Sequence, residues 1–394
     1  MIDLSRMILI DQHAHSLLAD FSTLDAIGFR QAFSESSSMA MLQDHVQHCL
    51  HYRHMLKQLG EFLDVRGEKA ILEMRSSLGA LDYAQMLFDA ASIGKFIIDN
   101  GFNREAMLNL SQLSQLSGRP VYKCARIETV LEDCLRTADS FAHLRELFAL
   151  GLGDQSDGRS GSRSESRSGA TLDAKLVSLK TIAAYRGGID LDTVSLSEAK
   201  DDFSAAQKQA RQEKRFRIGR RPLYHFFLAQ AFEIAQERSL PVQIHTGIGD
   251  RDADLRLSDP SYFRAILEAK TFAKTNFVFL HCYPFVRQAA ILASLYANVY
   301  FDLSLAVTLD SAQAVNLFAD ALSIAPFTKI LMGTDGHSVP ETYWYASSSM
   351  RTGLSGALSL LIAQRFLDEE EAMDIAAHLF HKNAQTLYQF DDDN

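Results

Sequence analysis

Short apolar runs alternate with longer amphipathic segments along most of the chain. Val, Ile, Leu and Phe concentrate in runs at 7–11, 95–99, 176–182, 241–245, 276–281, 298–304 and 329–335. Runs of this length bounded by polar residues are typical of buried strands. A weaker run at 120–128 brings the predicted strands to eight. Because these strands alternate with helical patterns, we predict an α/β fold with a parallel sheet that closes into a TIM-like (β/α)8 barrel.

Two segments interrupt the alternation. Residues 16–93 have mostly helical patterns, including "DHVQHCLHYRHMLKQLGEFL", and follow the first predicted strand. An insertion there would lie over the mouth of the barrel, where active sites are built, so we expect it to act as a cap. Residues 153–171 are rich in Ser, Gly and Arg without apolar anchors, which predicts a flexible loop. We therefore expect one barrel domain over residues 1–394 with these two insertions.

Composition narrows the class of protein. The net charge of −10 and the absence of a basic face outside 153–171 argue against nucleic acid as a partner. The four cysteines form no CxxC pair, so we expect reduced thiols. The chain has no apolar run of the length needed to cross a membrane, and "MILI" is too short for a signal peptide. We expect a cytoplasmic protein that acts on a small molecule without a membrane partner.

The stretch "IDQHAHS" at 10–16 places His13 and His15 at the end of the first predicted strand. Side chains at i and i+2 of a strand lie on the same face, so both imidazoles would leave the strand in one direction. Two neutral imidazoles that point together suit one metal ion. An exposed pair without a common role is the alternative for this short motif taken alone.

Further polar groups close other apolar runs. They are Lys180 in "VSLKTI", His245 in "VQIHTG", His281 in "VFLHCY" and Asp335 in "LMGTDGH". A single buried histidine is more often a hydrogen-bonded core residue, and a single aspartate is often a helix cap. The carboxyl ends of barrel strands surround one site, however, so groups at several of these ends would converge there. The set therefore predicts a metal centre of imidazole and carboxylate ligands.

Four histidines at i, i+3 spacing, His45, His48, His51 and His54, suggest a second metal site. On a helix each step of three residues rotates the side chain by about −60°, so the first and last would project from opposite sides. We expect surface or cap-facing histidines there.

The strand-end pattern resembles the amidohydrolase superfamily of metal-dependent barrels. The segments "LKTIAAYRGGIDLD", "IHTGIGDRDADLRLSDP", "LHCYPFVRQAA" and "GTDGHSVPETYW" resemble the branch that includes nodulin-like and FluG-like proteins. The resemblance implies that His13, His15 and Asp335 hold a first divalent metal ion, and that Asp335 accepts the proton of the attacking water. It also implies that His245 and His281 hold a second ion or contact the substrate.

The number and identity of the metal ions stay open at this point. Lys180 would bridge two ions only if its amine were carboxylated, because an ammonium offers no lone pair. We expect uncharged neighbours at the end of its strand; an unmodified lysine that contacts substrate is the alternative. Imidazole and carboxylate ligands suit zinc, which we expect, but also manganese and iron. Barrels of this kind often self-associate, so a homo-oligomer is a further expectation.

The resemblance implies hydrolysis of a C–N amide bond, in a γ-glutamyl-type or another carboxylate-bearing amide. Arg186, Arg251 and Arg256 follow strand ends, where a guanidinium could bind a substrate carboxylate, although ion pairs within "DRDADLR" explain the last two equally well. His337 could orient the substrate. Two alternatives are a metal-dependent decarboxylase, lyase or isomerase on the same barrel, and a binding or regulatory module without catalysis.

Overall fold

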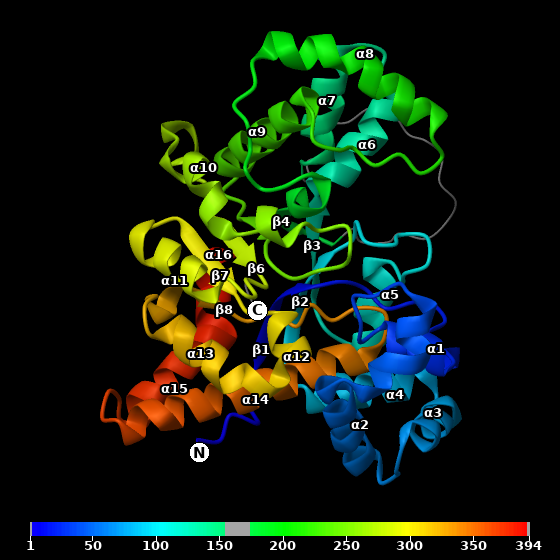
Figure 1. The fold of residues 1–394 in the computed structure, drawn as a ribbon, viewed down its shortest axis with the longest axis vertical. Coiled ribbons are helices and arrows are strands. Elements are labelled where there is room, and N and C mark those ends of the chain that lie inside the picture. Colours follow the sequence, from blue (N-terminus) through cyan, green and yellow to red (C-terminus); the bar gives the residue numbers. More distant parts are fainter. Residues whose placement is uncertain (1, 154–173, 392–394) are drawn as a thin grey trace.

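The computed structural model describes residues 2–153 and 174–391, and it is a single eight-stranded parallel sheet surrounded by helices (Figure 1). The strands follow one another in chain order around the sheet. They are β1 (Leu9–Ala14), β2 (Ile93–Asp99), β3 (Val121–Arg126), β4 (Leu176–Thr181), β5 (Val242–His245), β6 (Phe277–Leu280), β7 (Val299–Asp302) and β8 (Ile330–Leu331). The predicted TIM-like barrel, including the weaker strand at 120–128, is confirmed.

Burial on both faces explains why these strands are uniformly apolar in sequence. Every residue of β1, β4, β5 and β6 is buried, as expected for a parallel sheet covered by helices on one side and filled by its own side chains on the other. The eighth strand is shorter than its predicted range because residues after Leu331 form hydrogen bonds with β1 instead of β7.

Those hydrogen bonds close the barrel. The N–H of Gln12 donates to the carbonyl of Met332 at 3.2 Å, and the N–H of Asp335 donates to the carbonyl of His13 at 2.9 Å. The second bond joins two of the predicted metal ligands through their backbones. Barrel closure therefore brings residues 322 positions apart in sequence into contact.

A second core cluster fills the barrel below this edge. It contains residues near the beginnings of the strands, such as Ile10, Val177 and Val278, and residues of the C-terminal segment after α16 (Asn383–Leu387). Among the latter, Tyr388 donates a hydrogen bond from its hydroxyl to Oε1 of Gln12 at 2.6 Å. The C-terminal segment thus plugs the barrel and reaches the polar layer under the site.

The segment between β1 and β2 contains four helices, which lie together at the lower right of Figure 1. They are α1 (Ala26–Gln31), α2 (Leu50–Leu63), α3 (Glu68–Ser77) and α4 (Ala80–Ala90). The helix expected across the four histidines begins only at Leu50, because Cys49 is extended and ends the turns that precede it. His51 hydrogen-bonds to the carbonyl of Phe33, and His54 to the hydroxyl of Tyr345. His51 thus makes a contact within the insertion, whereas His54 joins the insertion to α14 (Pro340–Ala363).

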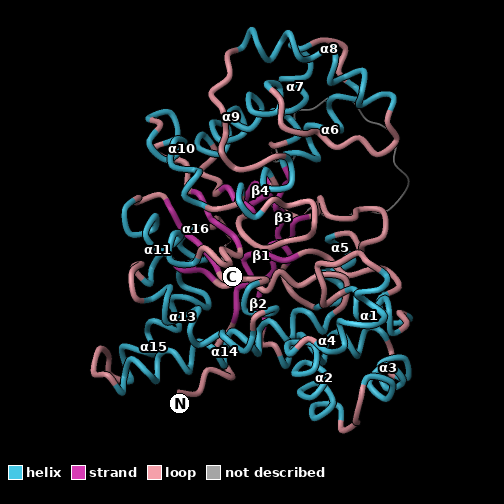
Figure 2. The backbone as a smooth tube through the Cα atoms, in the orientation of Figure 1, coloured by secondary structure: helices cyan, strands magenta, loops and turns pink. Residues whose placement is uncertain are grey.

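The remaining helices surround the strands, as the tube view in Figure 2 shows. They are α5 (Leu110–Ser117), α6 (Ile127–Thr137), α7 (Phe141–Gly151), α8 (Leu196–Gln212), α9 (Pro222–Glu237), α10 (Arg264–Glu268), α11 (Val286–Leu295), α12 (Ala306–Leu309), α13 (Ala314–Leu322), α14 (Pro340–Ala363), α15 (Glu369–Ala377) and α16. Capping boxes fix the starts of three of them, among them α8 at Ser195 and α15 at Asp368. Apart from Gly153, the predicted flexible loop lies outside the described residues.

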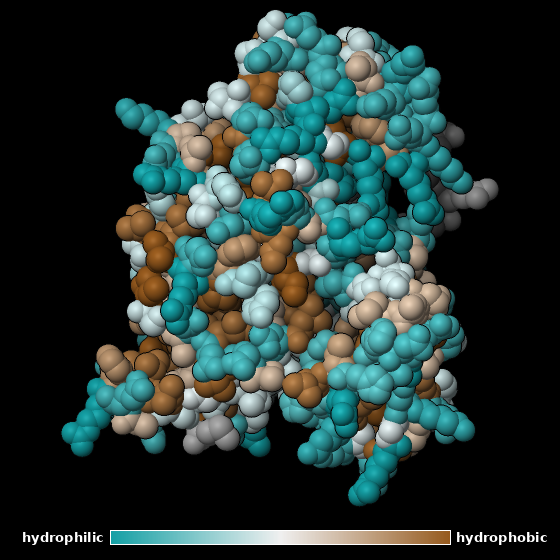
Figure 3. Space-filling view, viewed as in Figure 1, coloured by the Kyte–Doolittle hydropathy of each residue, from teal (hydrophilic) through white to brown (hydrophobic). Residues whose placement is uncertain are grey.

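The face shown in Figure 3 is mainly hydrophilic, with hydrophobic side chains near its middle and around α11. On α11, Ile291 and Leu295 are 45% and 69% exposed. Within 2–153 and 174–391, every helix is too short or too polar to cross a membrane.

A buried ion pair fastens the insertion to the barrel. Nε of Arg75 on α3 donates to Oε1 of Glu341 at 2.6 Å, and the hydroxyl of Tyr83 donates to the same oxygen at 2.9 Å. Both charged side chains are at most 1% exposed, and the guanidinium lies over the rings of Phe21 and Phe29. Glu341 is in the first turn of α14, a few residues after Asp335.

Replacing Arg75 by Met should lower the free energy of unfolding by about 3–5 kcal/mol, because Glu341 would stay buried without its counter-charge. The double variant Arg75→Met/Glu341→Met should recover most of that loss. Denaturant unfolding measures both. The matched control is Lys69→Met, which breaks the exposed Lys69–Glu73 pair on the same helix and should leave unfolding nearly unchanged; equal effects of the two single variants would contradict the assignment.

Candidate metal centre

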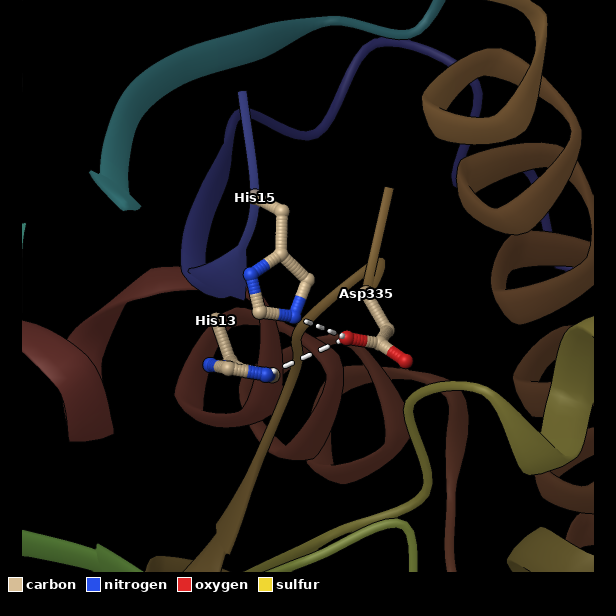
Figure 4. Close-up of side chains that lie close together, drawn as sticks. All are labelled: His13, His15 and Asp335. Carbon is tan, nitrogen blue, oxygen red and sulfur yellow. Dashed lines mark ion pairs between the residues drawn. The ribbon is translucent and has the colours of Figure 1, made fainter. Parts of the chain in front are cut away.

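Three side chains meet at the carboxyl end of the barrel: His13, His15 and Asp335 (Figure 4). Nε2 of His13 lies 3.1 Å from Oδ1 of Asp335, and Nε2 of His15 lies 3.4 Å from the same oxygen. One ligand atom of each residue lies within 4.8 Å of the other two. In the part of the chain that the structure describes, this is the one cluster of His, Cys, Asp or Glu side chains with such a spacing.

Irregular backbone places these groups. The register of β1 shifts between Asp11 and Ala14, and an irregularity of this kind changes the direction of a side chain. Asp335 has φ 50°, a left-handed conformation that costs about 1 kcal/mol for a residue other than glycine. The hydrogen bond from its N–H to His13 holds it there, and the N–H of Thr334 donates to the Asp11 carboxylate at 2.8 Å.

The hydrogen bonds around His13 leave its Nε2 unprotonated, and this nitrogen lies between Asp335 at 3.1 Å and Nζ of Lys180 at 2.9 Å. Gln243 donates through Nε2 to the carbonyl of Gln12 at 2.7 Å and to the hydroxyl of Tyr388 at 3.1 Å. Its Oε1 is therefore the acceptor that lies 2.9 Å from Nδ1 of His13. The proton of the imidazole belongs on Nδ1, which is the arrangement that metal-ligating histidines use.

His15 is oriented in the same way. Its Nδ1 lies 3.2 Å from the carbonyl oxygen of Asp99 and donates to it, so Nε2 faces Asp335 without a proton. Phe102 packs against the His15 ring with centroids 4.9 Å apart and also contacts the ring of His337. His337 itself lies beside the site, with Nδ1 3.2 Å from the carbonyl oxygen of Asp335.

This donor set fits a divalent metal ion. Oδ1 of Asp335 is buried and accepts no hydrogen bond of regular geometry, although two imidazole nitrogens lie close to it. A buried carboxylate oxygen without a donor is costly, and a cation between it and the two lone pairs would satisfy all three atoms. Two imidazoles and a carboxylate are ligands that zinc, manganese and iron accept.

The charge states of the site suit metal binding. Burial, assisted by the nearby charge of Lys180, lowers the pKa of His13 to about 4, so its imidazole is neutral at pH 7. Burial opposes ionisation of Asp335, but His281, His13 and His15 together hold the pKa of Asp335 well below its usual range. At neutral pH the site therefore presents a neutral imidazole on His13 and an ionised carboxylate on Asp335.

Lys180 lies at the centre of this cluster, and its surroundings differ from those expected. Its Nζ is 2.9 Å from Nε2 of His13 and 3.4 Å from Oδ2 of Asp99. The expectation of uncharged neighbours is wrong, because Asp99 ends β2 and is itself bound by Arg126 through Nε at 3.0 Å and Nη2 at 2.5 Å. Burial opposes the charge of Asp99, but Arg126 and then Lys180 hold its pKa well below its usual range. Lys180 and Asp99 are thus close enough to form an ion pair.

His281 and His245 adjoin the three clustered residues without joining them. Nδ1 of His281 lies 2.7 Å from the hydroxyl of Ser304, which itself donates to Asp302, so Nδ1 carries the proton. His245 lies beside it, with ring centroids 4.5 Å apart, and its Nε2 is 3.1 Å from the carbonyl oxygen of Ile248. Each imidazole keeps one unprotonated nitrogen for a substrate or a further ion.

The three candidate arginines have different surroundings. Arg256 is 87% exposed and donates through Nε and Nη2 to Asp254 at 3.0 and 2.7 Å. Arg251 is exposed on the same loop. Arg186 is mostly buried; its Nη2 lies 3.8 Å from Glu132, while its Nε has no hydrogen-bond partner. Arg256 thus forms the internal ion pair considered as an alternative, and Arg186 keeps a free donor.

The sequence did not predict several polar residues that hydrogen-bond to the predicted ligands or to their neighbours. These residues lie on the strands near the ligands: Asp11, Asp99, Gln243 and Asp302. The ends of the apolar runs "KFIID" and "NVYFD" could have suggested two of them. No sequence signal indicated Gln243, because its role depends on neighbours from β1 and the C-terminal segment.

A parallel eight-stranded barrel with this cluster at its carboxyl end is the architecture of a metal-dependent amidohydrolase. The chain belongs to the amidohydrolase family: residues 183–390, slightly more than half of the sequence, match the family model described as Amidohydrolase. The matched region includes His245, His281 and Asp335, whereas His13, His15 and Lys180 precede it.

Individual relatives agree with this assignment. Protein fluG of Emericella nidulans is 31% identical over 240 residues, which cover 57% of this chain and 27% of that protein, so the match spans about a quarter of its length. A proposed metal-dependent hydrolase from Lactobacillus casei ATCC 334 has 27% identity and a TM-score of 0.84 over 98% of this chain and 96% of that one. Uronate isomerase from Thermotoga maritima, with 13% identity, a TM-score of 0.64 and coverage of 98% and 95%, shares the fold.

The variants His13→Ala and Asp335→Asn should each lose bound metal, because each removes one of three clustered donors. Gln243→Leu should weaken metal affinity about 10–100-fold by releasing the His13 ring. Elemental analysis and chelator competition measure these losses. His48→Ala, at an exposed histidine of the insertion, is the control and should retain the wild-type metal content; unchanged metal in His13→Ala would refute the assignment of this centre.

Proposed function

We propose that this protein hydrolyses a C–N amide bond of a small molecule and uses one divalent metal ion, which we expect to be zinc. His13, His15 and Asp335 would hold this ion. The observation that carries the proposal is the buried Oδ1 of Asp335, which lies within 3.4 Å of one nitrogen of each of two imidazoles and accepts no regular hydrogen bond. The family assignment and the Lactobacillus casei relative support a metal-dependent hydrolase. The amide substrate is our own inference from the family resemblance.

A divalent ion in this position supplies Lewis acidity that activates a water molecule and polarises a carbonyl group. Asp335 is ionised and can accept a proton from the attacking water and return it to the leaving amine. Its second oxygen, Oδ2, lies 3.9 Å from Nδ1 of His281. The unprotonated nitrogens of His281 and His245 would accept hydrogen bonds from a substrate N–H group or from a water molecule bound to the substrate.

We assign Lys180 as an unmodified ammonium that pairs with Asp99 and gives up its contact with Nε2 of His13 when the ion binds, and we therefore propose a single ion. Carboxylation of Nζ would place a second anion about 3.4 Å from Asp99 in a buried site, whereas an ammonium there is attracted to it. The ammonium can donate to a developing oxyanion on the substrate. We propose that the free Nε of Arg186 binds a carboxylate group of the substrate. The proposed substrate is therefore still an amide that bears a carboxylate.

Removal of metal with a chelator should abolish amide hydrolysis, and zinc or manganese should restore it. The measurement is release of primary amine from a panel of γ-glutamyl and other carboxylate-bearing amides. Asp335→Asn should lose at least about 100-fold in kcat, the scale of a missing general base, while His48→Ala serves as the control. Metal-dependent sugar isomerisation or release of carbon dioxide without amide cleavage would instead establish the isomerase or lyase alternative.

Lys180→Met tests the single-ion assignment. The metal content should stay near one ion per chain in both the wild type and the variant, whereas kcat should fall because a donor to the substrate is lost. The comparison requires elemental analysis and kinetics on the same preparations. Two ions in the wild type that fall to one or none in Lys180→Met would show that the lysine is carboxylated and bridges a binuclear centre.

A further inference from the structure

The C-terminal end of the chain is fastened inside the barrel, below the candidate metal centre. Nδ2 of Asn383, the first residue of α16, donates to the carbonyl oxygen of Ile330 on β8 at 2.8 Å. Tyr388 is buried, and the ring of Phe390 lies beside that of Tyr122 with centroids 4.8 Å apart. This segment therefore places one phenol hydroxyl, that of Tyr388, among the buried polar groups of β1 and β5.

The neighbours of this hydroxyl fix the direction of each of its hydrogen bonds. The backbone carbonyl oxygen of Gln12 can only accept, so the end of the Gln243 amide that lies 2.7 Å from it is Nε2. The same nitrogen lies 3.2 Å from the side-chain amide of Gln12, which must therefore present Oε1 to it. The single O–H of Tyr388 donates to that oxygen at 2.6 Å, and a lone pair of the phenol accepts from Nε2 of Gln243 at 3.1 Å.

These bonds polarise the amide of Gln243 toward His13. Its Oε1 accepts the N–H of Nδ1 of His13 at 2.9 Å. An amide whose N–H groups are bonded is a stronger acceptor at its oxygen, because hydrogen bonds in a chain reinforce one another. A divalent ion on the opposite nitrogen of His13 makes Nδ1–H a stronger donor, so the bond to Gln243 matters most when the ion is bound.

Bulk water cannot replace the members of this relay. Gln12, His13 and Gln243 are fully buried, and apolar residues of the second core cluster surround Tyr388. A buried polar group that loses its partner stays unsatisfied, so each bond of the relay has a measurable effect on the next.

We propose that Tyr388 is a positioning residue of the metal centre, and that its hydroxyl raises the affinity of His13 for the ion by acting through Gln243. This inference rests on the proposed function, because it takes His13 as a ligand of the ion. The C-terminal segment thereby becomes part of the metal site, although it lies below the ligands and does not contact the ion.

The test compares the zinc affinity of the full chain with that of Tyr388→Phe by chelator competition. This variant keeps the ring and loses one hydroxyl, so its affinity should fall about three- to tenfold, the scale of one buried hydrogen bond. Tyr122→Phe is the matched control and should bind zinc as the wild type does, because it removes a hydroxyl from the same core cluster but outside the relay. Thermal unfolding of each variant establishes that the comparison is made on folded protein.

A double-variant cycle separates the relay from a general loosening of the core. Because Tyr388 acts through Gln243, Tyr388→Phe/Gln243→Leu should bind zinc no more weakly than Gln243→Leu alone, whereas independent effects would multiply. Unchanged affinity in Tyr388→Phe, an equal loss in Tyr122→Phe, or losses that multiply in the double variant would each overturn the proposal. If Gln243→Leu does not fold, the comparison of the two tyrosine variants still decides.

Amide turnover is measured separately from zinc affinity. Amide turnover by the wild type together with unchanged affinity in Tyr388→Phe refutes the role of Tyr388 alone. A loss of affinity in Tyr388→Phe without amide turnover by the wild type refutes the hydrolase proposal and leaves the positioning role standing.

Discussion

The closure of the barrel between its first and last strands is the constraint on which the candidate site depends. The hydrogen bond from the N–H of Asp335 to the carbonyl of His13 is part of that closure and also joins two of the proposed ligands. A left-handed residue such as Asp335 would relax to ordinary backbone if it were free, so the hydrogen bonds of residues 332–335 to β1 maintain it. The stability of the barrel and the geometry of the site therefore have the same origin.

A layer of buried polar groups continues this arrangement below the site. Tyr388 from the C-terminal segment and Gln12 fix the amide of Gln243, which in turn fixes the tautomer of His13. On the other side, Arg126 and Lys180 neutralise Asp99, whose carbonyl orients His15. Each ligand is thus held by a partner from a distant part of the chain, because a buried imidazole needs one defined hydrogen bond to present its other nitrogen.

The insertion after β1 is anchored to the barrel by a buried ion pair. The Arg75–Glu341 pair attaches it to the start of α14, close in sequence to Asp335. A barrel supplies similar strand ends in many enzymes, so insertions of this kind are where differences in substrate can arise.

The sequence by itself determined the barrel fold, through apolar runs of strand length that alternate with helical patterns. These runs are recognisable because a parallel sheet covered on both faces tolerates few polar residues within its strands. The polar residues that ended those runs, His13, His15, Lys180, His245, His281 and Asp335, could be recognised for the same reason. Tertiary structure alone decided which of them meet. It grouped His13, His15 and Asp335 and placed Asp99 beside Lys180. Those distances depend on strand register, barrel closure and the docking of the insertion, which arise from contacts between residues far apart in the chain and leave no periodic trace in the sequence.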